Sequence, residues 1–160
     1  MSIHVGDKVP SSTLMEMQEG GPKPVKTDDL FAGKKVVVFA LPGAFTPTCS
    51  AKHVPGFVQN FDALKKKGVD TIACLAVNDA FVMGAWGNAN NARGKVRMLA
   101  DGNGEFTKAV GLTLDASGFG MGTRSQRYAM IVKDGKVEHL FVEPGPGLTV
   151  SSAEAVLSKL

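Results

Sequence analysis

Cys49 is the residue whose type and position most clearly predict chemistry. It follows a loop rich in proline and glycine, 42–47, which itself follows an apolar run. A helix is expected to begin near Cys49, and the first turn of a helix offers unpaired N–H groups and the positive end of the helix dipole. Both favour the thiolate, the nucleophilic form of cysteine. Free cysteines are often packed core residues, but this corner position and its polar neighbours favour a functional cysteine.

The neighbours of Cys49 allow more than one interpretation. Thr46 lies three residues before Cys49, so its hydroxyl could hydrogen-bond the thiolate or an incoming oxygen, or cap the helix. Pro42 and Pro47 could stiffen the loop and shield the sulfur from water, or simply mark turns. The residues alone leave these alternatives open.

Two further side chains could work with Cys49. His53 lies four residues later and could be a base, a metal ligand or a packed histidine. A zinc site needs about four ligands at suitable spacing, and none assembles here, so we favour the packed role. Cys74 lies within an apolar run and could be an inert core thiol or a resolving cysteine. A disulfide needs Cα atoms roughly 4.4–6.8 Å apart, so we favour the core role.

Apolar runs followed by helical patterns predict the strands and helices that position Cys49. The expected strands are Val36–Leu41, Thr71–Val77, Val96–Ala100, Arg127–Val132 and Lys136–Val142, with Asp134 and Gly135 joining the last two as a hairpin. The expected helices run from about Thr48 to Lys67 with a kink or break at Pro55, from an Asn78–Asp79 cap to about Asn90, from Glu105 to Val110, and over Ser152–Leu160. Phe81 and Trp86 are expected in the core.

This order predicts an α/β fold. Helical crossovers favour parallel strands inside the sheet, and the closing hairpin adds antiparallel strands at one side. A thioredoxin-like fold with insertions has such an order, although other α/β folds share it. The chain of 160 residues shows no internal repeat and no long linker. We therefore expect residues 1–160 to form a single domain.

Composition excludes several classes of function. The net charge of +3 and the short basic run Lys65–Lys67 give no reason to expect nucleic-acid binding. The chain shows no apolar run of the length that spans a membrane and no signal-peptide pattern at its start, so a cytoplasmic location is expected. The final residues, Ser158–Leu160, match a peroxisomal address if the source is eukaryotic.

The spacing Pro42-x-x-x-Thr46-x-x-Cys49 resembles the Pro-x-x-x-Thr/Ser-x-x-Cys motif of peroxiredoxins. Separate blocks resemble the type II branch of that family, also called type V. These blocks are Phe45–Ser50, His53–Phe57, Val77–Met83 and Gly122–Tyr128. The resemblance runs from about residue 3 to the C-terminus.

The resemblance implies a thioredoxin-like fold and a thiol-dependent peroxidase that reduces hydrogen peroxide and alkyl hydroperoxides. Cys49 matches the peroxidatic cysteine, and Pro42 and Thr46 match its motif partners. Arg127 matches the family's arginine, with Arg124 as the competing candidate. A permanently charged arginine beside the sulfur would favour the thiolate and donate hydrogen bonds to the peroxide. No metal or bound cofactor is implied.

The resemblance also implies a substrate pocket. Backbone N–H groups at Thr48 and Cys49 would complete the donors, while Leu114 and Phe119 would form an apolar wall. The segment Gly118–Gly122 lacks the Lys-Ser/Thr of a phosphate loop, and we interpret it as a flexible loop that approaches the site.

The reductant implied by the resemblance is an outside thiol. Some relatives carry a resolving cysteine where this chain has Val150, so a disulfide through that route cannot form here. Some members use a cysteine at the position of Cys74. Glutathione with glutaredoxin, or thioredoxin, is the expected reductant. The family commonly dimerises through the face that carries the active site, so a homodimer is expected.

Two other classes of function compete with the peroxidase. A Cys–His hydrolase would use Cys49 and His53 for acyl transfer. A non-enzymatic redox sensor or chaperone with the same fold would oxidise slowly and pass the signal to a client protein.

Overall fold

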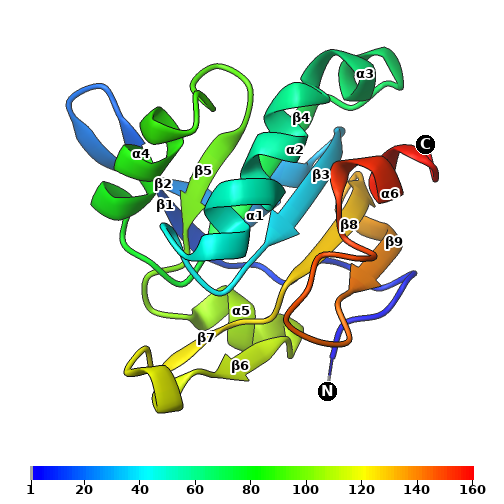
Figure 1. The fold of residues 1–160 in the computed structure, drawn as a ribbon. Helices are drawn as coiled ribbons and strands as arrows, with labels where there is room; N and C mark the ends of the chain where they lie inside the picture. The colour runs from blue at the N-terminus through cyan, green and yellow to red at the C-terminus, as the bar shows by residue number, and fades with distance from the viewer. Residues whose placement is uncertain (1) are drawn as a thin grey trace.

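The central sheet of the computed structural model, which describes residues 2–160, has seven strands (Figure 1). They are β1 Thr13–Gln18, β2 Gly21–Lys26, β3 Lys35–Ala40, β4 Thr71–Ala76, β5 Arg97–Ala100, β8 Tyr128–Lys133 and β9 Lys136–Val142. Their order across the sheet is β2-β1-β5-β4-β3-β8-β9. β3, β4 and β5 pair in parallel and all other neighbours pair antiparallel. The predicted parallel centre with an antiparallel hairpin at one side is therefore confirmed.

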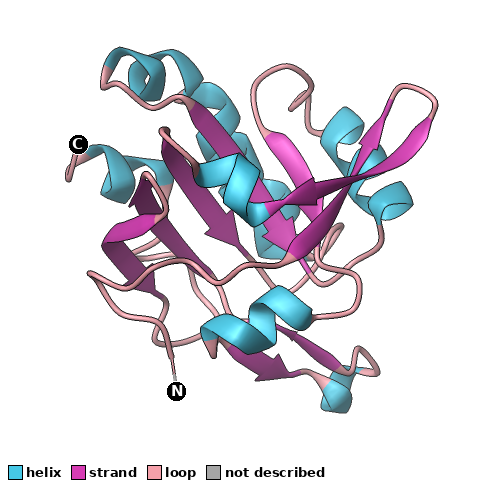
Figure 2. Cartoon of the chain, turned by 180° about the vertical axis from the view of Figure 1, so that it is seen from behind, coloured by secondary structure: helices cyan, strands magenta, loops and turns pink. Residues whose placement is uncertain are grey.

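Helices cover both faces of this sheet (Figures 1 and 2). They are α1 Thr27–Phe31, α2 Val54–Gln59, α3 Phe61–Lys66, α4 Ala80–Ala89, α5 Glu105–Val110 and α6 Ala153–Leu157. Apolar side chains of α2, α3, α4 and α6 pack in one core, and those of α1 and α5 pack in a second core on the opposite face. No helix among the described residues is long and apolar enough to cross a membrane.

The apolar run of β3 shows how the sequence produces these two cores. Val37 and Phe39 face the α2 side, while Val36 and Val38 face the α1 side. Successive side chains of a strand point to opposite faces, so a strand buried on both faces must be apolar throughout. This physical requirement is why the central strands could be recognised from the sequence.

Several predicted elements agree with the structure to within about two residues. α4 begins after Asp79, whose carboxylate accepts a hydrogen bond from the Val82 N–H, and α6 begins after Ser152, whose hydroxyl accepts from Ala155. Asp134 and Gly135 have φ angles of 47° and 79°, as a tight hairpin between β8 and β9 requires. Trp86 is buried, but Phe81 is 66% exposed, so its predicted core position was wrong.

The long helix expected over Thr48–Lys67 is divided differently from the prediction. A π-helical turn, Cys49–His53, comes first, and α2 then begins with Pro55 in its first turn. Pro55 lacks an N–H and cannot continue the ordinary ladder of a helix, and it follows directly after the π-helical turn, in which the Val54 N–H donates to the Cys49 carbonyl. The break falls at Asn60 between α2 and α3, where the side-chain amide donates to the Gly56 carbonyl. The helix is therefore irregular just before Pro55, where a kink or break was predicted, and the further break at Asn60 was not predicted.

The β1–β2 hairpin was not predicted. β2 contains Pro22 and Pro24, which cannot donate to a ladder and obscure a strand pattern. β2 is an edge strand, where such prolines are tolerated. A second small sheet, β6 Thr113–Asp115 with β7 Thr123–Ser125, was also missed because its strands are only three residues long.

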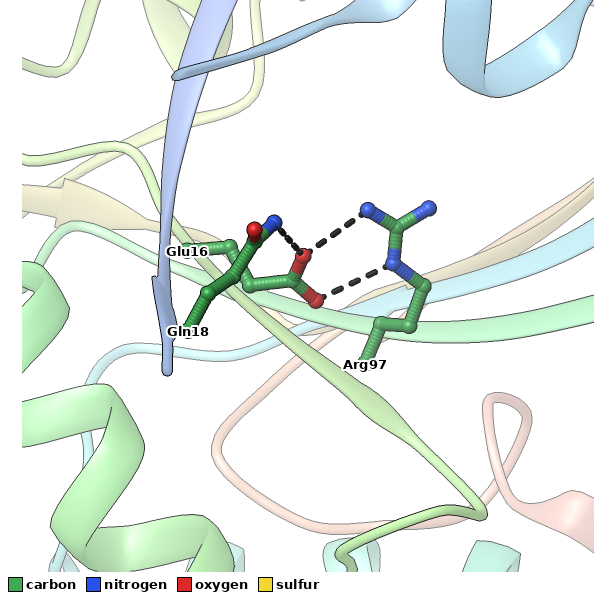
Figure 3. Close-up of polar contacts among 3 residues, drawn as sticks. All are labelled: Glu16, Gln18 and Arg97. Atoms are coloured by element: carbon green, nitrogen blue, oxygen red, sulfur yellow. Dashed lines mark hydrogen bonds and ion pairs between the residues drawn. The ribbon is translucent and has the colours of Figure 1, made fainter. Parts of the chain in front are cut away.

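A bidentate ion pair joins β1 to β5 (Figure 3). Arg97 donates from Nε and Nη2 to the two Glu16 carboxylate oxygens at 3.0 and 2.9 Å, and Gln18 donates to Glu16 Oε1 at 3.0 Å. Burial raises the pKa of Glu16, but the hydrogen bonds from Arg97 and Gln18 outweigh it and lower the pKa. The pair is partly exposed, so we assign it about 1 kcal/mol of stability or less.

Candidate functional site

Cys49 lies just beyond the carboxyl end of β3. The helix begins at Pro47 and passes at once into the π-helical turn that starts with Cys49. Within that turn the Val54 N–H donates to the Cys49 carbonyl. Such turns occur frequently at functional sites. The Cys49 side chain is fully buried, so the sulfur is held in a defined environment rather than displayed on the surface.

Hydrogen bonds anchor the loop before Cys49. The Ala44 N–H donates to Asn78 Oδ1 at 2.9 Å, and the Thr46 hydroxyl donates to the Gly43 carbonyl at 2.8 Å. Phe45 has a φ angle of 63°, a left-handed conformation that is uncommon for a bulky residue and indicates strain. Strain of this kind persists only where surrounding contacts enforce it. These contacts hold the loop in a defined conformation just before Cys49.

Arg127 contacts the sulfur directly. Its Nη2 donates to Cys49 Sγ at 3.0 Å. β3 and β8 pair antiparallel with Ala40 opposite Tyr128, which places Arg127 beside the carboxyl end of β3. The guanidinium is buried, and its Nε lacks a hydrogen-bond partner among the described residues. A spare buried donor beside a nucleophile can bind an incoming oxygen.

Arg124, the competing arginine, has a different role. Its Nε donates to the Met121 carbonyl at 3.0 Å, and its Nη1 donates to the Pro42 carbonyl at 3.3 Å. These contacts join the loop 116–122 to the loop 42–47, which precedes Cys49. The Pro42 carbonyl therefore anchors Arg124, and the loop 116–122 lies close to the loop before Cys49 as expected.

His53 is buried behind Arg127. Arginine can only donate, so His53 Nδ1 accepts from Arg127 Nη1 at 2.9 Å and Nε2 carries the hydrogen that is donated to the Ser151 carbonyl at 2.9 Å. Burial lowers the pKa of His53 to about 4, helped by the nearby Arg127 charge and opposed by the Ser151 hydrogen bond. His53 is thus a neutral, packed histidine that orients Arg127.

The remaining predicted residues are placed as follows. The Thr46 hydroxyl hydrogen points to Gly43 rather than to Cys49, so its lone pairs stay free to accept. Thr48 is half-buried in the first turn of the helix. Leu114 is 37% and Phe119 is 87% exposed, so any apolar wall that they form lies at the surface.

Cys74 is a free, buried thiol in β4. Burial raises its pKa well above the ordinary value, and the neighbouring Cys49 raises it further, while Arg127 opposes the shift. Cys74 lies opposite Phe39 of β3 and in the same buried cluster as Cys49. The raised pKa means that it is protonated and a poor nucleophile where it stands.

Two hollows in the surface lie away from the contact between Cys49 and Arg127. One of about 870 Å³ is lined by residues such as Lys65, Arg93 and Arg97, and one of about 320 Å³ by residues such as Met15 and Asp101. Neither is lined by Cys49 or Arg127. Within residues 2–160, no group of three or more His, Cys, Asp or Glu side chains is arranged to hold a metal ion. The candidate chemistry centres on the buried hydrogen bond from Arg127 Nη2 to Cys49 Sγ.

Comparisons with known proteins point to a single family. A family model described as Redoxin matches residues 4–157. Peroxiredoxin-2B of Arabidopsis thaliana is 48% identical, covering 99% of this chain and 98% of that protein. Peroxiredoxin-2E, chloroplastic, of the same plant is 52% identical, covering 99% and 70%. The crystal structure of reduced Prx3 in complex with H₂O₂ from Vibrio vulnificus has a TM-score of 0.95 and 53% identity, covering 98% of each chain.

Proposed function

This chain belongs to the peroxiredoxins of the redoxin family, which are thiol-dependent peroxidases, and on that premise we propose that Cys49 is its peroxidatic residue and Arg127 its activating partner. The observation that carries the assignment is the 3.0 Å hydrogen bond from Arg127 Nη2 to Cys49 Sγ. Both side chains are buried, so the guanidinium charge acts on the sulfur with little screening by water.

The proposed reaction is a two-electron oxidation of sulfur. The Cys49 thiolate attacks the terminal oxygen of hydrogen peroxide or an alkyl hydroperoxide, forming an S–O bond as the O–O bond breaks. The sulfur becomes a sulfenic acid, and the leaving oxygen takes a proton and departs as water or an alcohol. Negative charge moves from sulfur to the leaving oxygen during this step. Arg127, with Nη2 on the sulfur and Nε unpartnered among the described residues, can stabilise both ends.

Thr46 and Pro42 orient the peroxide in this proposal. The Thr46 hydroxyl donates to Gly43, so its oxygen can accept a hydrogen bond from the peroxide O–H. The Pro42 carbonyl is held by Arg124, which keeps the loop close to the sulfur. Backbone N–H groups at Thr48 and Cys49 would supply further donors, and Leu114 and Phe119 would line the approach of organic peroxides.

We assign the second half of the cycle to an outside thiol. An incoming thiol attacks the sulfenic sulfur, releases water and forms a mixed disulfide, and a second thiol then regenerates Cys49. Val150 carries no thiol, and Cys74 is buried with a raised pKa. Glutathione with glutaredoxin, or thioredoxin, fits this requirement. Steady-state turnover compared across glutathione, glutaredoxin and thioredoxin tests the assignment.

Cys74→Ser is expected to leave turnover with the preferred external reductant within about twofold of the unsubstituted protein, because a protonated core thiol takes no part in resolution. Serine is close in size to cysteine, so a modest loss of stability is expected. Peroxide consumption at saturating reductant measures the effect. Collapse of turnover, together with a Cys49–Cys74 disulfide found by mass spectrometry, would refute it.

We also propose that the chain acts as one domain and as a homodimer. Phe45 lies in the loop before Cys49, and Leu114 and Phe119 lie in the segment that Arg124 ties to that loop; all three are exposed and support a protein contact on that face. A sedimentation mass equal to one chain at micromolar concentration would rule the dimer out.

A reducing, cytoplasmic location suits free Cys49 and Cys74. Microscopy of the tagged chain with and without Ser158–Leu160 tests the peroxisomal alternative.

A further inference from the structure

Glu143 holds a network that no step of the proposed reaction uses. It directly follows β9 and is 7% exposed. Its carboxylate accepts hydrogen bonds from Thr149 N and Oγ1, Val150 N, and Ser151 N and Oγ at 2.7–3.1 Å. Burial raises the pKa of Glu143, but these hydrogen bonds outweigh it and lower the pKa to about 2. The ionised carboxylate therefore organises the segment 149–151 around itself.

This segment continues into the active site. The Ser151 carbonyl accepts from His53 Nε2 at 2.9 Å, and His53 Nδ1 accepts from Arg127 Nη1 at 2.9 Å. Arg127 Nη2 then donates to Cys49 Sγ at 3.0 Å. Ser151, His53, Arg127 and Cys49 are all buried. An uninterrupted series of hydrogen bonds thus connects the Glu143 carboxylate to the sulfur.

Glu143 is also fixed to Arg127 through the main chain. The Glu143 N–H donates to the Arg127 carbonyl at 3.0 Å, so the backbones of the two residues lie side by side. The connecting residues 144–147 are exposed and rich in proline and glycine. The Glu143 carboxylate holds Thr149, Val150 and Ser151 from the side of β9, and α6 begins directly after Ser151 with Ser152 as its cap.

We propose that Glu143 is a positioning residue for the peroxidatic centre, acting on Arg127 through the Ser151 carbonyl and His53. This inference rests on the proposed function of Cys49 and Arg127. The Ser151 carbonyl keeps the hydrogen of His53 on Nε2, which leaves Nδ1 free to accept from Arg127. When Glu143 loses its charge, segment 149–151 loosens, His53 loses its acceptor, and Arg127 is no longer held against the sulfur.

Glu143→Gln tests this inference, with Glu138→Gln as the matched control on the exposed face of β9. The amide nitrogen that this substitution introduces would meet N–H groups that now donate to a carboxylate oxygen, so part of the network must break. The pH midpoint of Cys49 alkylation by iodoacetamide is expected to rise by about one unit, and kcat/KM for hydrogen peroxide to fall about tenfold. Glu138→Gln is expected to leave the alkylation midpoint unchanged and to change kcat/KM by no more than about twofold.

A double-mutant cycle shows whether His53 transmits the effect. In a His53→Ala background, Glu143→Gln should shift the alkylation midpoint little further, because the shared route is already broken. Equal shifts in both backgrounds would contradict the route through His53. A lowered melting temperature with an unchanged alkylation midpoint would show a purely structural role and overturn the proposal.

Two features keep the test decisive. If Glu143→Gln fails to fold, Thr149→Val removes one donor to the carboxylate at a residue that is exposed, and a smaller shift in the same direction is expected; no shift would contradict the proposal. Alkylation needs no peroxide, so its result stands even if Cys49→Ser still reduces peroxide. In that case the proposed function fails while the positioning role of Glu143 remains measurable.

Discussion

Arg127→Gln is expected to lower kcat/KM for hydrogen peroxide by about 10²–10³, the usual effect of removing one preorganised donor from a site where charge develops. Glutamine keeps an amide donor but loses the charge beside Cys49 Sγ and the fork that also reaches His53. Arg127→Lys keeps the positive charge but loses the forked guanidinium. Its kcat/KM should therefore lie between that of the unsubstituted protein and that of Arg127→Gln. Stopped-flow peroxide consumption measures all three proteins.

Two arginines serve as comparisons for this prediction. Arg93 is exposed and lies in the hollow remote from Cys49, so Arg93→Gln should leave kcat/KM unchanged. Arg124→Gln should reduce it less than Arg127→Gln, because Arg124 contacts the Met121 and Pro42 carbonyls rather than the sulfur. A greater loss for Arg124→Gln would contradict the assignment of Arg127.

Acid should destabilise the fold through His53. Its pKa is about 4 in the folded protein, against an ordinary value of 6.5. Between these values the unfolded chain binds a proton that the folded chain does not, so the free energy of unfolding falls as pH falls. The loss amounts to about 3 kcal/mol from pH 7 to pH 4. Urea unfolding at the two pH values measures it.

His53→Gln should lose most of this pH dependence, since glutamine does not titrate but can still donate to Ser151 and accept from Arg127. His139→Gln, on β9, should keep it. The low pKa of Glu143, about 2, contributes a separate loss as pH falls from its ordinary 4.5 toward 2. If the substituted and unsubstituted proteins lost equal stability between pH 7 and pH 4, His53 would not be the group responsible.

The sequence allowed the central sheet to be predicted because its strands are buried on both faces. Val36–Ala40 is an apolar run with no polar interruption, and Asp134–Gly135 specifies a tight turn. The β1–β2 hairpin was not predicted, because Pro22 and Pro24 obscure the pattern of an edge strand. Pro55 marked the irregular part of the long helix, which is the π-helical turn directly before it, but no proline or glycine marks the second break at Asn60.

The part of the candidate site that lies within one short segment could be predicted from the spacing of its residues. The Pro42, Thr46 and Cys49 spacing lies in a single loop, and Arg127 was assigned through the family resemblance. The contact between His53 and Arg127 depends on how helix and sheet pack, which sequence spacing does not reveal. Glu143 was missed because its donors come from a segment without helical or strand periodicity.

The central claim is that Cys49 reduces peroxide with the help of Arg127, and one measurement tests it most directly. The reduced protein is mixed with one equivalent of hydrogen peroxide in a stopped-flow instrument, and the product is identified by mass spectrometry. The account predicts rapid loss of peroxide with one added oxygen atom on Cys49 and none on Cys74, and no rapid loss in Cys49→Ser. Rapid peroxide loss that persists in Cys49→Ser would contradict it, and slow oxidation of Cys49 without turnover would instead indicate a redox sensor.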